Sequence, residues 1–341
     1  MTTEATTSLL DRRIVIVTGK GGTGKTTVSA ALALAAADRG QRVLVVEVGP
    51  FEHIPALLGG SPGGHTEAVG YAGRTLRPGL RAMRIDPYAA VAEYLGLQIG
   101  SPRLVELALR NRALKQFLSG APGWRELITL GKIWHLERQR TPAGEPQHDL
   151  IVVDAPATGH GITFLDVPHV VRSAVRSGPL ARNAGNVADL MRDPARTLVL
   201  PVSLAEELPT QETAELVVRI RKDLGMRIDR VVVNAVADPP PVARPRELRS
   251  ALESLGTGLP FRTLPQPPSL VHALEHLTSR HALNQRYLRE IEARTGLPTS
   301  PLPLIARGIE GLDALRRLAV PLLEDPQRSH GHSDDASRVA P

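Results

Sequence analysis

The stretch that most constrains this chain is residues 13–27, RIVIVTGKGGTGKTT. Within it, residues 19–26 fit G-x-x-x-x-G-K-[ST], the phosphate-binding loop. An apolar run precedes the loop and a segment rich in alanine and leucine follows it. These are the strand and the helix that the motif requires on either side. We therefore predict a strand over 13–18, a helix from Lys25 to about residue 39, and a site for the phosphates of a nucleotide between them.

The residue types in the loop suit that chemistry. Glycines let the backbone turn sharply and bring its N–H groups against phosphate oxygens, and the helix directs its positive end at the same anion. Lys25 is expected to contact the β- and γ-phosphates, and the Thr26 hydroxyl to ligate Mg²⁺. The alternative is a glycine turn without a ligand. The predicted nucleotide-binding residues of the loop are Gly19, Lys20, Gly21, Gly22, Thr23, Gly24, Lys25, Thr26 and Thr27.

A second lysine opens the loop at Lys20. The chain has five lysines against 36 arginines, and two of the five lie in this turn. The pattern resembles the deviant loop of a group that contains the MinD and ParA ATPases, nitrogenase iron protein, and the arsenite-pump and tail-anchored-protein-targeting ATPases. In that group the extra lysine crosses a dimer interface to the nucleotide of the partner. The resemblance implies a dimer and a catalytic role for Lys20 beside Lys25; the alternative is a solvated lysine.

Composition excludes several classes of function. A hydrophobic content of 42% and a charged content of 22% over 341 residues are typical of a soluble globular protein. The net charge is +6, but the arginines are dispersed, so we expect no specific nucleic-acid partner. Without cysteine there is no disulfide and no thiolate site for a metal or for arsenite. The N-terminus lacks signal-peptide features and no apolar run could span a membrane, so we expect a cytoplasmic protein.

Apolar runs that suit buried strands alternate with helical patterns along the chain. The alternation predicts an α/β fold with a doubly wound and mainly parallel sheet. Together with the phosphate-binding loop, whose pattern resembles that of the ATPase group above, it leads us to expect one P-loop ATPase domain over residues 12–324. A helical insertion is expected at about 86–145 and 160–195, disorder at 1–11 and 325–341, a loop at 59–79 and a proline-rich linker at 239–245. Further strands are expected at 43–48, 80–85, 148–154, 197–202 and 231–234, and later helices at 246–255, 268–295 and 308–324.

Two apolar stripes mark the helical insertion. Each stripe is either core between helices or a groove for an apolar partner helix. The first consists of Leu104, Leu107, Leu114 and Leu118, and the second of Trp124, Leu127, Ile128 and Trp134.

Three stretches carry a more specific resemblance. The segment D-A-P-A-T-G-H, from Asp154, with F-L-D-V-P at 164–168, resembles D-T-A-P-T-G-H…F-L-x-x-P of the arsenite-transporter (ArsA) and guided-entry ATPase family. Residues 80–94, L-R-A-M-R-I-D-P…E-Y, are similar to a second motif of that family. So are S-L-A-E-E-L-P-T-Q-E-T at 203–213 and R-V-V-V-N at 230–234. With the phosphate-binding loop, the resemblance covers most of residues 12–237.

The resemblance assigns roles to further residues, with ATP and Mg²⁺ as cofactors. Asp154 would hold the water shell of Mg²⁺, a role that its place at a strand end also suits. Thr158, Gly159 and His160 would form a switch that relays the nucleotide state to the helical insertion. Asn234 would read the adenine edge. Each of these residues also has a purely structural alternative. Asp154 could cap a loop, His160 could be a packed structural histidine, and Asn234 could be an asparagine in a turn.

One departure from the family affects catalysis. After its second strand the family carries D-P-A-H, whose aspartate positions the attacking water, whereas the aligned residues here are G-P-F-E with Gly49 at the place of the aspartate. Glu47 lies two residues earlier, on the same face of the strand, and is our candidate substitute. We therefore expect ATP binding with slow intrinsic hydrolysis.

With the family resemblance, the sequence thus predicts a dimeric Mg-ATP-dependent ATPase, of the membrane-protein-targeting or the anion-pump type, that opens and closes a helical surface for a client. The partner would be a second copy or a paralogous ATPase, and the client a membrane protein or a membrane-bound partner that draws the chain transiently to a membrane. One alternative is a nucleotide-binding subunit with little turnover of its own that pairs with a paralogous ATPase. Another is a positioning ATPase of the MinD or ParA kind.

Overall fold

A single eight-stranded sheet organises the molecule. The computed structural model describes residues 9–59, 69–112, 116, 120, 123–174, 178–239, 267–306 and 308–325. The strand order is β3-β4-β2-β5-β1-β6-β7-β8, and every neighbouring pair is parallel except β3 with β4. This confirms the expected α/β class. The strands are β1 (Ile14–Gly19), β2 (Val43–Glu47), β3 (Arg74–Arg77), β4 (Leu80–Arg84), β5 (Leu150–Asp154), β6 (Thr197–Leu204), β7 (Val231–Val236) and β8 (Thr299–Pro303).

The strands β1, β2 and β5 are neighbours in the middle of the sheet, and the residues of the predicted site lie at or after their carboxyl ends. Every residue of the three is buried, which is why their sequences read as continuous apolar runs. β1 lies between β5 and β6, with Val17 opposite Asp154 on one side and Leu200 on the other. The loop that follows β1 therefore emerges at the middle of the carboxyl edge.

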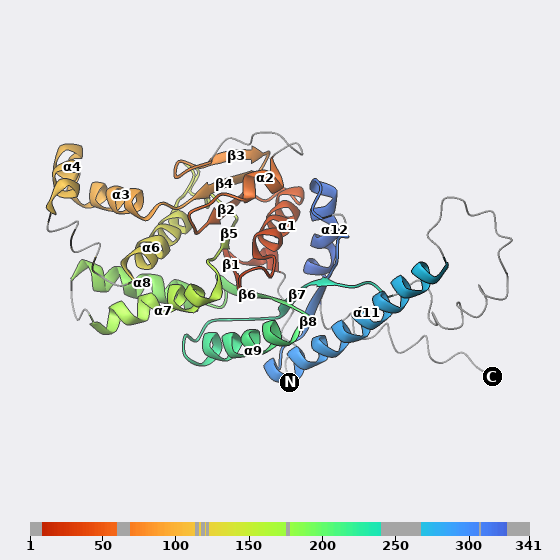
Figure 1. The fold of residues 1–341 in the computed structure, drawn as a ribbon. Helices are drawn as coiled ribbons and strands as arrows, with labels where there is room; N and C mark the ends of the chain where they lie inside the picture. The colour runs from red at the N-terminus through yellow and green to blue at the C-terminus, as the bar shows by residue number, and fades with distance from the viewer. Residues whose placement is uncertain are drawn as a thin grey trace.

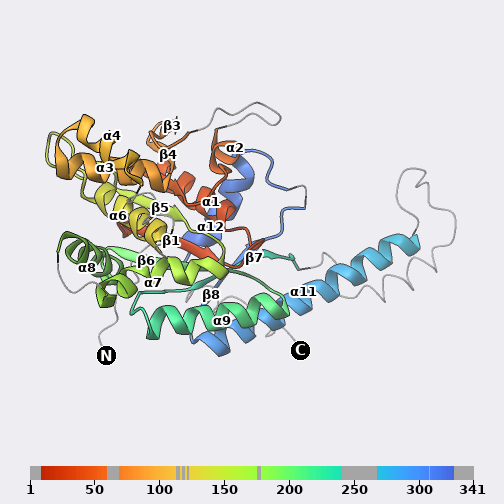
Figure 2. The same cartoon turned by 60° about the vertical axis from the view of Figure 1, so that its left-hand side comes forward.

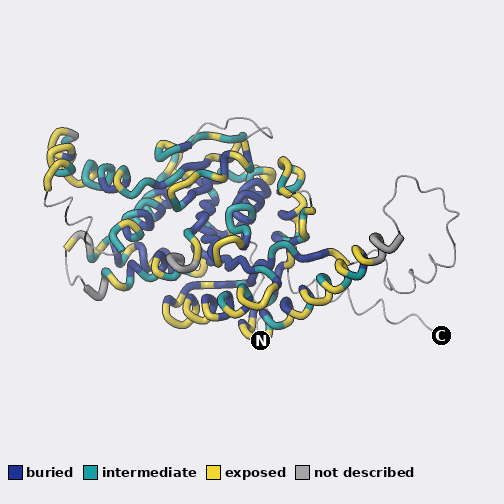
Figure 3. Tube along the Cα trace, in the orientation of Figure 1, coloured by how far each residue is buried: buried dark blue, intermediate teal, exposed yellow. Residues whose placement is uncertain are grey.

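Helices cover both faces of the sheet (Figures 1 and 2). On one face lie α1 (Lys25–Asp38), α2 (Ile54–Leu58) and α12 (Leu312–Leu323), whose apolar side chains form one core with the sheet. On the other face lie α6 (Trp124–Arg138), α7 (Thr158–Ala174), α8 (Pro179–Arg192), α9 (Glu207–Lys222) and α11 (Pro267–Thr295). Figure 3 shows the buried strands between these layers.

The helical insertion extends from the sheet through α3 (Pro87–Ile99) and α4 (Pro102–Arg110), as Figure 1 shows. Asp86 caps α3 by accepting a hydrogen bond from the Ala89 N–H at 2.8 Å. Leu104 and Leu107 on α4 are 53% and 67% exposed, so these two leucines of the first apolar stripe are not core. Its other two leucines lie outside the described residues. The second stripe lies partly in the core, with Leu127 buried.

Some expectations need correction. β3 lies inside the segment 59–79, for which the sequence predicts a loop. The sequence pattern does not predict β8, because two of its five residues are prolines. Residues Leu9–Asp11 form a short 3-10 helix, η1, with both leucines buried, so this part of the segment 1–11 is folded. The expected helix at 246–255 and the tail beyond residue 325 lie outside the described residues.

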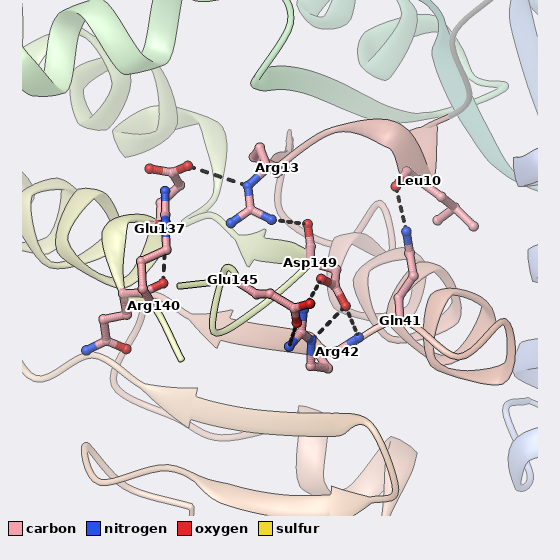
Figure 4. A network of polar contacts seen from close by, with 9 residues as sticks. Leu10, Arg13, Gln41, Arg42, Glu137, Arg140, Glu145 and Asp149 are labelled. Carbon is pink, nitrogen blue, oxygen red and sulfur yellow. Dashed lines mark hydrogen bonds and ion pairs between the residues drawn. The ribbon is translucent and has the colours of Figure 1, made fainter. Parts of the chain in front are cut away.

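A network of ion pairs joins the amino ends of the central strands, at the edge opposite the loop (Figure 4). Arg42, just before β2, pairs with Asp149, just before β5, through Nη2 and Oδ1 at 2.8 Å and Nε and Oδ2 at 3.0 Å. Arg13, just before β1, donates to the backbone carbonyl of Asp149 at 2.8 Å and pairs with Glu137 of α6. The network fixes the register at that edge and takes no part in the predicted site.

Among the residues that the structure describes, no helix combines the length and apolar character needed to cross a bilayer.

Candidate active site

The loop between β1 and α1 has the backbone of a phosphate cradle. Gly22 and Gly24 have φ of 83° and 89°, in the left-handed region that favours glycine. A Cβ on Gly24 would lie 2.1 Å from Nδ2 of Asn234, and that amide donates to the backbone carbonyl of Thr23 at 3.0 Å. The Thr23 hydroxyl in turn donates to the carbonyl of Lys20 at 2.9 Å. The loop is thus held closed by its own threonine and by the end of β7.

Lys25 begins α1 and turns back over the loop. Its Nζ donates to the carbonyl of Lys20 at 2.9 Å, and the side chain is about half-buried. Burial lowers the pKa of Lys25, while the charge of Asp154 acts in the opposite direction. A desolvated ammonium at a helix N-terminus is a favourable place for a phosphate anion.

Asp154 ends β5 directly beside α1. Its Oδ2 accepts a hydrogen bond from the Thr26 hydroxyl at 2.7 Å, and its Oδ1 accepts one from the Ser29 hydroxyl at 3.3 Å. Burial raises the pKa of Asp154, and the bond from Thr26 and the charge of Lys25 oppose that shift. Sequence reasoning missed Ser29, although its spacing of three from Thr26 places both hydroxyls on one face of α1.

The donor set fits Mg²⁺. A threonine hydroxyl and a carboxylate are the hard oxygen ligands that this ion prefers, and it commonly retains several water ligands in such sites. The two groups are within hydrogen-bond distance of each other through Thr26 Oγ1 and Asp154 Oδ2. Thr26 and Asp154 are therefore the residues that would hold the ion, Asp154 through water.

Glu47 ends β2 next to Asp154 and is 3% exposed. Its Oε1 accepts hydrogen bonds from the backbone N–H groups of His53 at 2.6 Å and Ile54 at 3.1 Å. Burial raises the pKa of Glu47 and the charge of Asp154 adds to the shift, while the two N–H groups act against it. The carboxylate that was our candidate for the missing aspartate therefore also anchors the segment that contains Gly49.

Known proteins confirm the resemblance. A family model described as anion-transporting ATPase matches residues 12–179. The chain is 31% identical over 330 residues to the ATPase BagA of Mycobacterium tuberculosis, covering 93% of this chain and 94% of that protein. The chain belongs to the anion-transporting ATPase family.

Two more distant relatives show the range of that family. The arsenical pump-driving ATPase of Escherichia coli is 28% identical over 77% of this chain, a match that spans 48% of the E. coli protein. The ATPase ASNA1 homolog of Entamoeba dispar is 25% identical over 65% of this chain and 76% of that protein. The sheet order and the phosphate-binding loop described above are consistent with this family of ATPases.

The structure describes the predicted switch only in part. Gly49 follows β2, and a Cβ built on it meets nothing within 4 Å. Residues 158–160 form the first turn of α7, but the side chains of Thr158 and His160 lie outside the described part. Their role as a switch stays a prediction, as does the contact of Asn234 with adenine.

The carboxyl end of β7 is held by a residue that no motif marked. Ala235 has a φ of 56°, and the pairing of β7 with β8 is irregular there. Asn284 of α11, 4% exposed, accepts from the Ala237 N–H at 2.9 Å and donates to the Ala205 carbonyl at 3.2 Å. This amide ties the ends of β6 and β7 together beside the loop.

Proposed function

We propose that the chain is a Mg-ATP-dependent ATPase that acts as a dimer and uses ATP binding and hydrolysis to open and close a helical surface. One observation carries the proposal. Lys25 and Thr26, neighbours in the sequence, converge with Asp154, 128 residues after Thr26, around the glycine loop at the carboxyl edge of the sheet. Each offers the charge or the oxygen that a nucleotide and its metal need.

The chemistry follows from these residues. The loop N–H groups and Lys25 bind the β- and γ-phosphates and offset their charge. When bound, Mg²⁺ would supply positive charge to the phosphate oxygens. A water molecule attacks the γ-phosphorus, the bond from that phosphorus to the bridging oxygen breaks, and ADP leaves with that oxygen. The water gives up one proton to solvent as inorganic phosphate forms. Lys20 of a second protomer would add positive charge to the γ-phosphate as it transfers.

The path to a helical surface begins at Asp154. α7 starts four residues after it, and α7 packs against α6 and α8. A change at the phosphate site would therefore move the first turn of α7 and, with it, the insertion. α3, α6 and α8 enclose a mainly apolar cavity of about 210 Å³, and the exposed leucines of α4 lie beyond it. These features support a surface for an apolar helix, such as that of a membrane-protein client.

The proposal is tested by titrating ATP into the protein and measuring binding heat, mass in solution and phosphate release. We expect micromolar binding that needs Lys25, and a mass that doubles with Mg-ATP. The absence of ATP binding by the wild-type protein would refute the proposal. A mass that does not change with ATP would refute the dimer alone.

A second function is favoured by Gly49. The chain then serves as a nucleotide-binding subunit with little turnover of its own, paired with a paralogous ATPase that retains the aspartate. This version predicts that the chain alone binds ATP but hydrolyses it at a rate near background. Adding the paralogue should restore hydrolysis, and a brisk rate without it would favour the first version.

A further inference from the structure

Glu47 and Asp154 form a pair of carboxylates at the carboxyl edge of the sheet. They are register partners in the neighbouring parallel strands β2 and β5. Side chains alternate between the faces of a sheet, so Glu47 shares a face with Val45, and Asp154 with Val152. Both valines belong to the core that α1 covers. The two carboxylates therefore lie side by side on the face that carries the phosphate-binding loop.

Their hydrogen-bond partners differ. Both oxygens of Asp154 accept a hydroxyl from α1. Glu47 uses only Oε1, which accepts from the two backbone N–H groups that begin α2. Its Oε2 is buried and has no hydrogen-bond partner among the residues that the structure describes. A buried carboxylate oxygen without a partner is costly, and a second carboxylate alongside increases the cost.

A divalent cation would remove both costs at once. It offsets the charge of two carboxylates, and its bound waters donate hydrogen bonds to oxygens that lack a partner. The orphaned oxygen of Glu47 thus fits the same ion that Thr26 and Asp154 fit. A role confined to capping α2 would account for Oε1 and leave Oε2 unexplained.

We propose that Glu47 is the second carboxylate of the magnesium site and acts with Asp154 through the water shell of the ion. The inference rests on the proposed function, because it needs a nucleotide-bound metal. It also makes Glu47 a positioning residue, since the other oxygen of the same carboxylate holds residues 53 and 54. Glu47 thereby links the segment 48–53, which includes Gly49, to the metal, although the segment has no aspartate that could contact the ion.

The test separates metal binding from nucleotide binding. The affinity of a fluorescent ADP is measured in EDTA, and Mn²⁺ is then titrated into the protein–ADP complex and followed by electron paramagnetic resonance. Glu47→Gln keeps an acceptor for the two N–H groups and removes the charge. We expect its ADP affinity in EDTA to stay within about twofold of wild type. Its Mn²⁺ affinity should fall at least about tenfold, the size of a lost hydrogen bond to a charged group.

Glu52→Gln is the matched control. Glu52 lies in the same segment, but both of its oxygens have partners in the N–H groups of Val69 at 2.7 Å and Gly70 at 2.9 Å, and Arg84 also contacts it. Its Mn²⁺ affinity should equal that of wild type. If the wild-type protein binds Mn²⁺ and Glu47→Gln binds it with the same affinity, the inference is overturned and the proposed function stands. A wild type that binds no nucleotide would overturn both.

A measurement on the wild type covers the case in which the variant does not fold. Adding Mg²⁺ to the ADP complex should slow hydrogen exchange at the amides of His53 and Ile54 at least about threefold, because the ion fixes the carboxylate to which they donate. Exchange at these amides that is the same with and without Mg²⁺ would contradict the link between metal and segment.

Discussion

Lys20, the first lysine of the phosphate-binding loop, forms an ion pair with Glu212 of α9 in the same chain. The side chains are 50% and 36% exposed, so the pair is accessible. In the dimer that we propose, Lys20 serves the nucleotide of the partner. The contact with Glu212 would then have to break when two ATP-loaded protomers meet.

Glu212→Gln should therefore make dimerisation easier. An exposed ion pair contributes on the order of 0.2–1 kcal/mol, so we expect half-maximal dimer formation at about two- to fivefold lower ATP concentration. Light scattering across an ATP titration measures this. Glu215→Gln, an exposed carboxylate one turn further along α9, is the control and should behave as wild type. A higher ATP requirement in Glu212→Gln would show that the pair supports the dimer instead.

Lys25→Ala should abolish ATP binding, because it removes a half-buried cation from a site built around phosphates. We expect the affinity measured by calorimetry to fall at least about 100-fold, the effect of losing a charged contact in a desolvated site. Lys222→Ala, on the exposed end of α9, is the control for a lost lysine. An unchanged affinity in Lys25→Ala would exclude the loop as the site.

Gly24→Ala should damage the site more than Gly22→Ala does. Both glycines have positive φ, so both variants carry a similar backbone strain of about 1–2 kcal/mol. Only at Gly24 would the new methyl group strike Nδ2 of Asn234, whereas nothing lies within 4 Å of a Cβ on Gly22. Thermal unfolding and ADP binding of the two variants compare them directly. Equal losses would mean that the contact between Asn234 and the loop has no effect.

Gly49→Asp should raise the rate of ATP hydrolysis. Losing a group that orients the attacking water costs about 10²–10⁴-fold, and an aspartate at this place should recover about tenfold. The backbone tolerates the change, since Gly49 does not have positive φ and a Cβ meets no atom within 4 Å. Phosphate release is measured with Glu47→Gln in parallel. A rapid wild-type rate that survives Glu47→Gln would show that another group places the water.

His148 should make the protein less stable in mild acid. It is buried, and burial together with Arg81, Arg13 and Arg42 lowers its pKa to about 4. The unfolded chain takes up this proton near pH 6.5, before the folded protein does, so stability present at neutral pH is lost as the pH falls from about 7 toward about 4. We expect a loss of about 2–3 kcal/mol between about pH 7 and pH 4.5 in urea unfolding. His148→Gln should lack that slope, and an equal slope in the variant would assign it to other groups.

Local patterns predicted the centre of this fold better than its margins. β1, β2 and β5 are apolar on both faces because they are buried on both faces, and their sequences show it directly. The two strands that were missed, β3 and β8, are the edges of the sheet. An edge strand tolerates residues such as Pro301 and Pro303, which the pattern of a central strand excludes.

In the candidate site, the sequence predicted the residues that belong to motifs and missed those that act through tertiary contacts. The loop motif marked Lys25 and Thr26, and the family motif marked Asp154, because each has a fixed spacing in the sequence. Ser29, Glu212 and Asn284 lie in ordinary helical positions and take part only through tertiary contacts, 125, 192 and 79 residues from their partners. The second function of Glu47, as the acceptor for residues 53 and 54, likewise depends on how the chain turns after β2.

The packing of α12 on α1 has a consequence for synthesis. The helix that begins with Lys25 and Thr26 is covered by Leu315, Leu318 and Leu322 of a segment made almost 300 residues later. A ribosome that has produced only the first two-thirds of the chain therefore presents an alanine-rich helix with an open apolar flank, a surface prone to aggregation. Nucleotide binding should accordingly mature late, after the segment that contains α12 has left the exit tunnel.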